Sequence, residues 1–213
     1  MGKFLEKWET RPSTSVGTKV KEALRPPPPL KPRLEAAIRS LQSQINKLDM
    51  AHAKLMDRDR QLFAKIVEAY TRHDMDHANV YANELAEIRK MAKMLMQSRL
   101  ALEQIVVRLS TVKDLGDIVV TLAPALGVVR DVKQGITTVL PEAERELGEI
   151  GSLLSGILVD AGQMGGLTIN FGAASEDAQK ILAEAAAVAE QRMKEKLPEL
   201  PASLPSIEGR SEL

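Results

Sequence analysis

The 213-residue sequence contains no cysteine, so disulfide bonds, thiolate catalysis and cysteine-ligated zinc sites are excluded. Aromatic residues are also scarce, with three Phe, two Tyr and one Trp. Because aromatic side chains supply much of the buried area of compact cores, this scarcity favours an elongated helical protein over a compact enzyme. The sequence also has no P-loop, GxSxG or Rossmann fingerprint, and we therefore expect neither catalysis nor a bound cofactor.

Long apolar runs are absent as well. No stretch approaches the roughly 20 apolar residues that a membrane-spanning helix needs. The N-terminus also lacks an apolar core of signal-peptide length. We therefore expect a cytoplasmic protein.

The charges balance overall but are unevenly distributed along the chain. Residues 1–72 hold 15 Lys and Arg against 8 Asp and Glu, whereas residues 73–213 hold 14 against 21. This asymmetry predicts a basic surface that binds an anionic partner, and an acidic half of the chain that competes with the partner for that surface. The alternative is that long solvated helices simply carry many charges. No zinc finger, helix-turn-helix or RNP-like motif is present, so specific nucleic-acid binding is not expected.

Residues 33–110 carry the strongest pattern, in which apolar positions recur in alternating steps of four and three. In the first half these positions are Leu34, Ile38, Leu41, Ile45, Leu48, His52, Leu55, Asp59, Leu62, Ile66 and Ala69. In the second half they are Tyr81, Leu85, Ile88, Ala92, Leu95, Arg99, Leu102, Val106 and Leu109. Neither half contains Gly or Pro, and such heptads predict two long helices folded back on each other, each about 50–60 Å long. Between them, Asp74 or Asp76 could cap the second helix.

The N-terminal segment is amphipathic and basic. Large apolar side chains beside lysines are what a shallow membrane-surface helix requires, because rings bury at the headgroup boundary and ammonium groups meet anionic lipid. The first long helix would extend this positive face. The candidate membrane-binding residues are Lys3, Phe4, Leu5, Lys7, Trp8, Arg33, Arg39 and Lys47. The alternative is that the N-terminal apolar residues pack on the protein's own helices. Four prolines, Pro26 to Pro29, then predict a polyproline II spacer, with an SH3-type ligand as the alternative.

After the hairpin the pattern weakens into shorter helices. Gly127 and Gly135 are predicted to act as joints, Pro141 as a break or first-turn residue, and Ser175 as the start of a final helix. The sequence after that helix alternates Leu with Pro. A backbone restricted in this way lowers the entropy cost of docking into a groove, and we expect the tail to bind a partner.

Taken together, the chain resembles an ESCRT-III protein of the archaeal cell-division (CdvB-type) branch. The resemblance rests on the order of its parts and on Leu197-Pro198-Glu199-Leu200-Pro201, which is similar to the proline-rich MIT-interacting motif. It implies an all-α fold with an amphipathic N-terminal segment and proline-rich spacer (1–32), a long helical hairpin (33–110), shorter core helices (111–160), a flexible linker (161–174), and a C-terminal helix with a Leu/Pro tail (175–213).

The resemblance further implies membrane-bound filaments that contain this chain and its paralogues, constrict or sever membrane necks, and are remodelled by a AAA+ ATPase. The expected place is the inner face of the cell membrane at the division site. The residues implied to bind the MIT domain of that ATPase are Leu197, Pro198, Leu200, Pro201, Leu204 and Pro205.

The histidines and an alternative function remain to be considered. His73 and His77 have the spacing of metal ligands on a helix, but no Cys or third His is near, and we expect no metal site. His52 is expected to set the helix register as a polar core group. The alternative function is that of a coiled-coil adaptor that binds partners through its proline segments and has no membrane role.

Overall fold

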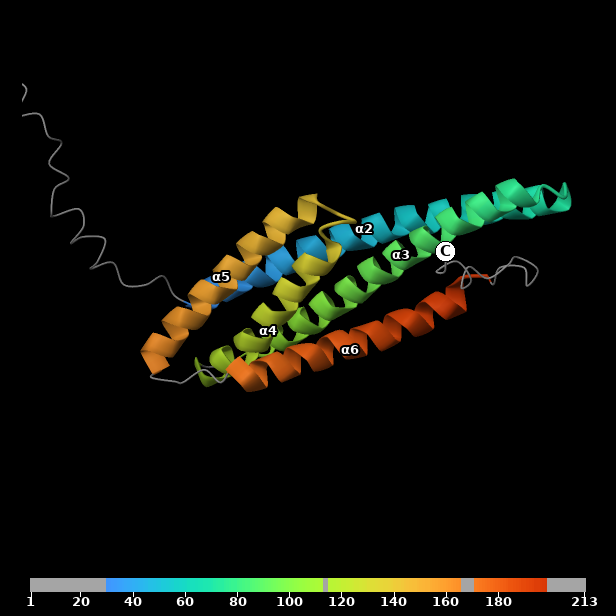
Figure 1. The fold of residues 1–213 in the computed structure, drawn as a ribbon. Helices are drawn as coiled ribbons and strands as arrows, with labels where there is room; N and C mark the ends of the chain where they lie inside the picture. Colours follow the sequence, from blue (N-terminus) through green and yellow to red (C-terminus); the bar gives the residue numbers. More distant parts are fainter. Residues whose placement is uncertain (1–29, 113–114, 166–170, 199–213) are drawn as a thin grey trace, which may run out of the picture.

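A computed structural model describes residues 30–112, 115–165 and 171–198. Over these ranges the chain forms five helices and no strand, which confirms the all-α prediction. The helices are α2 (Leu30–Thr71), α3 (Met75–Ser110), α4 (Leu115–Ile136), α5 (Glu142–Gly165) and α6 (Phe171–Lys196). Figure 1 shows that α2 and α3 form a long hairpin, with the other helices packed along its open half.

The turn between α2 and α3 is short and well capped. Asp74 is the N-cap of α3, and its carboxylate accepts a hydrogen bond of 3.2 Å from the backbone N–H of His77. His73 has a φ of 59°, the left-handed conformation that reverses the chain direction. Of the two capping residues that the sequence allowed, the structure therefore selects Asp74.

The heptad positions form the contact between α2 and α3. Leu41, Leu48 and Leu62 on α2 are almost fully buried, as are Leu85 and Leu102 on α3. The buried residues fall into two groups, a large core at the open half of the hairpin and a small one near the tip. Between these groups, no residue from 49 to 58 on α2 and none from 86 to 91 on α3 is buried.

The charged residues among the heptad positions pair across the hairpin. Asp59 is only 2% exposed, and the Arg89 guanidinium lies 2.7 Å from its carboxylate. Arg99 lies 3.5 Å from the carboxylate of Asp49. Asp49 and Asp59 are separated by the same number of residues as Arg89 and Arg99. One antiparallel register of α2 and α3 therefore satisfies both pairs, and a shift of one helix by a heptad would break both.

The later helices fold back onto the hairpin. α4 pairs with α5, α5 packs along α2, and α6 packs against α3 and α4. The tip of the hairpin extends past all three, as Figure 1 shows. We call this arrangement closed, because α5, which is acidic, packs against the basic helix α2.

Several helix boundaries differ from the sequence prediction. α4 continues through Pro124, Gly127 and Gly135. The chain breaks at residues 137–141, which agrees with the break predicted at Pro141. The expected joint at Gly127 is wrong because that glycine serves a close approach: a Cβ there would lie 2.9 Å from the Cβ of Ala178 on α6.

The start of the last helix also differs. α6 begins at Phe171, so Ser175 lies inside the helix. α5 extends to Gly165, and the helices therefore take both ends of the range 161–174. Residues 166–170 lie outside the described residues.

Replacing Asp59 tests the register. Asp59→Ala leaves the partly buried Arg89 without its counter-charge, and we expect it to lower the free energy of unfolding by about 2–3 kcal/mol. The matched control is Asp57→Ala, which removes an exposed carboxylate paired only with Arg60 along the same helix. This control should change the stability by less than about 0.5 kcal/mol. Urea unfolding followed by circular dichroism measures both, and equal losses would contradict a special role for the buried pair.

Candidate functional surfaces

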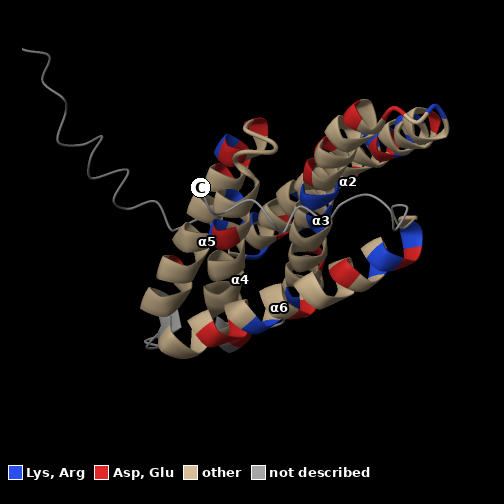
Figure 2. Cartoon of the chain, turned by 45° about the vertical axis from the view of Figure 1, so that its right-hand side comes forward, with Lys and Arg blue, Asp and Glu red and all other residues tan. Residues whose placement is uncertain are grey.

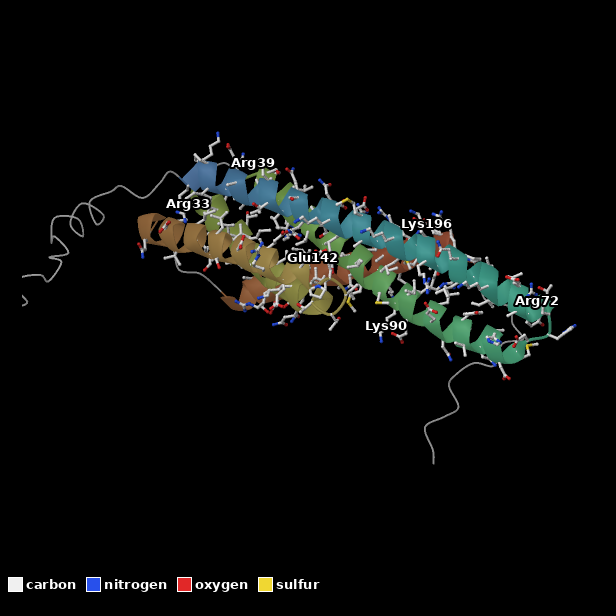
Figure 3. The ribbon with its side chains drawn as sticks, turned by 90° about the horizontal axis from the view of Figure 1, so that it is seen from above. Arg33, Arg39, Arg72, Lys90, Glu142 and Lys196 are labelled. Atoms are coloured by element: carbon white, nitrogen blue, oxygen red, sulfur yellow. The ribbon has the colours of Figure 1, made fainter. Side chains whose placement is uncertain are left out.

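The predicted membrane-binding residues are divided between described and undescribed parts of the chain. Lys3, Phe4, Leu5, Lys7 and Trp8 lie outside the described residues. Arg33, Arg39 and Lys47 lie on α2, where Arg39 is exposed and the other two are partly buried. Figure 3 places Arg33 between α2 and α5, and Arg39 on the outer side of α2.

The other two residues pair with acids on α5. The Arg33 guanidinium donates a hydrogen bond to the carboxylate of Asp160. The Lys47 ammonium lies 2.6 Å from the carboxylate of Glu146, which also accepts from the amide of the buried Gln44. In this closed arrangement, two of the three candidate cations on α2 are therefore already paired with acids of α5.

Shape as well as charge brings α5 to α2. At Gly156 an added Cβ would lie 2.8 Å from a guanidinium nitrogen of Arg33, so the absence of a side chain leaves room for that group. The α5 side chains of Leu154 and Ile157 are fully buried in the large core. Exposed ion pairs contribute little, and the pairs with Arg33 and Lys47 are partly exposed, so burial of apolar surface supplies most of the attachment.

The rest of the positive face on α2 is interrupted by acids. Arg58 pairs with Glu84 on α3. Figure 2 shows basic and acidic residues interspersed along the hairpin. Arg60 and Arg72, the latter just after α2, pair with acids of α2, and Lys65 lies 5.5 Å from the ring centre of Tyr81. Apart from the terminal Lys31, the exposed bases of α2 that form no ion pair or ring contact with another described residue are Arg39 and Lys54.

Only the first two residues of the predicted ATPase-binding motif are described. The backbone N–H of Leu197 donates to the carbonyl of Met193 at 3.0 Å, and its side chain is half-buried against the core. Pro198 is exposed. Leu200, Pro201, Leu204 and Pro205 lie outside the described residues.

The histidines show two different environments. His77 donates or accepts through Nδ1 at 2.7 Å from the Asp74 carboxylate, at the exposed hairpin tip. His52 is half-buried between α2 and its neighbours, and its Nε2 is buried without a hydrogen-bond partner. Burial lowers the pKa of His52 below its ordinary value of 6.5, because the charged form loses hydration. Over the described residues, no group of three or more potential metal ligands gathers in one place.

None of the described helices is long and apolar enough to cross a membrane. Sequence reasoning identified the basic residues of α2 but not their partners Glu146 and Asp160. No local pattern encodes which turn of α5 faces which turn of α2.

No protein-family model matches the sequence, and no solved structure matches it. Two proteins of Sulfolobus acidocaldarius are similar to it. Cell division protein B1 is 45% identical over 175 residues, which are 82% of this chain and 82% of that protein. Cell division protein B is 33% identical over 161 residues, which are 76% of this chain and 62% of that protein.

Neutralising Glu146 tests the attachment of α5. Glu146→Gln removes the counter-charge of Lys47, and we expect amide hydrogen exchange in α5 to become about 2–5-fold faster. The control is Glu149→Gln, one turn further along α5, where the carboxylate pairs only with Arg145 of the same helix. Mass spectrometry of exchanged peptides measures both, and an unchanged rate in the Glu146 variant would mean that apolar contact alone holds the helix.

Proposed function

Because the chain belongs to the archaeal CdvB-type branch of the ESCRT-III family, we propose that it is a polymer-forming subunit that acts in cell division. Its copies assemble into filaments on anionic membrane at the division site, on the inner face of the cell membrane. The filaments constrict or sever the membrane neck, and a AAA+ ATPase disassembles them. The similarity to two cell-division proteins of one organism supports this proposal and favours copolymers with paralogues.

The shape of the hairpin supports assembly. Near the tip, only α2 and α3 cover the small apolar core, and Val67 and Val80 are exposed beside it. Further large apolar side chains are exposed elsewhere on the described helices, among them Val107 on α3 and Val120 on α4. Such surfaces on one elongated molecule favour heterologous contacts between copies, and contacts that do not close produce filaments.

Membrane binding uses the N-terminal amphipathic segment together with the basic side of α2. In the closed arrangement Asp160 and Glu146 occupy Arg33 and Lys47, which leaves Arg39 as the candidate on α2 that forms no ion pair with another described residue. Release of α5 returns two positive charges to the surface and increases attraction to anionic lipid. The closed chain is therefore the weaker binder and the open chain the stronger one.

Electron microscopy of the purified full chain with anionic liposomes tests this function. We expect filaments or coated tubules, with liposome binding that salt weakens and that Phe4→Ala with Trp8→Ala reduces. The double variant Glu146→Lys with Asp160→Lys should bind more strongly than the unaltered chain.

The control adds the same positive charge away from α2, through Asp131→Lys with Glu184→Lys, two exposed positions on α4 and α6, neither of which packs against α2. A smaller gain in the control separates the release of α5 from a general effect of charge. Dispersed particles and untouched vesicles, also after a paralogue is added, would instead favour the coiled-coil adaptor.

Recruitment of the ATPase requires the leucines of the tail. Leu200→Asp with Leu204→Asp should weaken binding of the MIT domain by at least about tenfold, because each buried leucine contributes about 1.5–3 kcal/mol. Ser203→Asp with Ser206→Asp adds the same charge beside the leucines and should cost far less. Isothermal titration calorimetry measures both affinities, and equal losses would point to charge instead of the leucines.

A further inference from the structure

His52 stands at a heptad position in the contact between α2 and α3. Leu48, one turn before it, is fully buried, and Leu55 after it packs against the large core. The register of the hairpin places His52 opposite Met96 on α3, which is 4% exposed. The imidazole ring is thus partly enclosed by apolar side chains, where a charge is poorly solvated.

The buried nitrogen of the ring distinguishes its two protonation states. Nε2 is buried, and none of the described residues offers it a hydrogen-bond partner. The neutral ring tolerates this arrangement, because it can hold its proton on Nδ1 and leave Nε2 as an unprotonated acceptor. The charged ring carries an N–H on both nitrogens, so Nε2 would become a buried donor without an acceptor. The packing therefore fits the neutral ring only.

The charges around His52 also oppose a positive ring. Burial is the largest cause of its lowered pKa, and Arg99 on α3 and Lys196 at the end of α6 lower the pKa further. Asp49 on α2 raises the pKa, but its side chain is 64% exposed and lies 3.5 Å from Arg99. α5, the other helix on α2, begins at Glu142, whose side chain is exposed. A charged ring would therefore face two cations and one carboxylate that already has a partner.

We propose that His52 is a proton-sensitive residue, which holds α2 and α3 together when it is neutral and separates them locally when it is charged. The charged ring leaves the contact for water, which removes its packing against Met96 and opens the two helices over about one turn. The end of α6 loosens at the same level, because Lys196 then meets a further cation. This inference concerns the single chain, so its failure is distinct from failure of the proposed function.

Proton linkage fixes the direction of the effect. A locally opened His52 takes up its proton near its ordinary pKa of 6.5, whereas the packed ring takes up a proton only at lower pH. The open state therefore gains population as the pH falls below about 6.5, and the effect is absent well above about pH 7. Since a single proton is involved, the opening equilibrium rises by at most about tenfold for each unit of pH.

Hydrogen exchange of the full chain between about pH 5.5 and 7.5 tests the proposal. After correction for the intrinsic pH dependence of exchange, the opening equilibrium of residues 48–56 and 92–100 should be about three- to tenfold larger at the lower pH. His52→Gln, which has no titrating ring, should remove this difference. His52→Leu should do the same with an apolar heptad residue, in case glutamine weakens the helix contact. His77→Gln, at the exposed hairpin tip, is the control and should leave the difference in place.

A second arm follows the titration of the ring itself. Nuclear magnetic resonance reports the protonation of His52, and loss of its signals in His52→Gln assigns them. Lys196→Glu removes a neighbouring cation and should raise the titration midpoint by about 0.3 or more. Lys194→Glu, an equal reversal on a residue that pairs with Glu190, should move it less. A midpoint at or above about 6.5 in the unaltered chain would overturn the proposal. Equal pH dependence of exchange in the unaltered chain and both His52 variants would overturn it as well.

Discussion

The register between α2 and α3 is the constraint on which the rest of the structure depends. Apolar heptads alone leave the hairpin free to slip by whole repeats, because each repeat presents similar leucines. The buried Asp59 with Arg89, and Asp49 with Arg99, add two charge pairs that only one alignment satisfies. A buried ion pair need not add net stability, but a slipped register would bury an unpaired carboxylate at a cost of several kcal/mol. This alignment also positions Lys93 opposite α6, and fixes the face of α3 against which α6 and α4 pack.

The attachment of the later helices is of a different kind. α5 is held to α2 by buried leucines and isoleucines, with partly exposed pairs at Arg33 and Lys47. α6 follows α3 with an alanine-rich face, in which Ala185 and Ala189 bury little area per residue. The alanine-rich contact of α6 buries less area per residue than the leucine-rich contact of α2 with α3, so we expect α6 to separate from α3 more readily than α2 does. α5 lies over Arg33 and Lys47 and pairs with both of them.

The hairpin was predictable from the sequence, whereas the packing of the later helices was not. From Leu34 to Leu109 the heptad positions recur in steps of four and three residues, and no Gly or Pro interrupts either half, which defines two long helices. The heptad pattern is absent at residues 71–77, which defines the turn. The prediction of a joint at Gly127 was wrong because glycine occurs both where a helix bends and where two helices pack closely. Only the position of Ala178 on α6 shows that the second case applies here. Ser175 resembled a cap, yet the helix begins a turn earlier at Phe171. The partners of Arg33 and Lys47 depend on long-range geometry that no local pattern carries.

The small apolar core at the tip of the hairpin has a mechanical consequence. Of the described residues, only those of α2 and α3 build this core, whereas residues of all five helices build the large core at the open half. A pair of helices bends more easily than a bundle of five, because its cross-section is smaller. The open half is therefore the stiff part of the described molecule, and flexure under load concentrates in the tip.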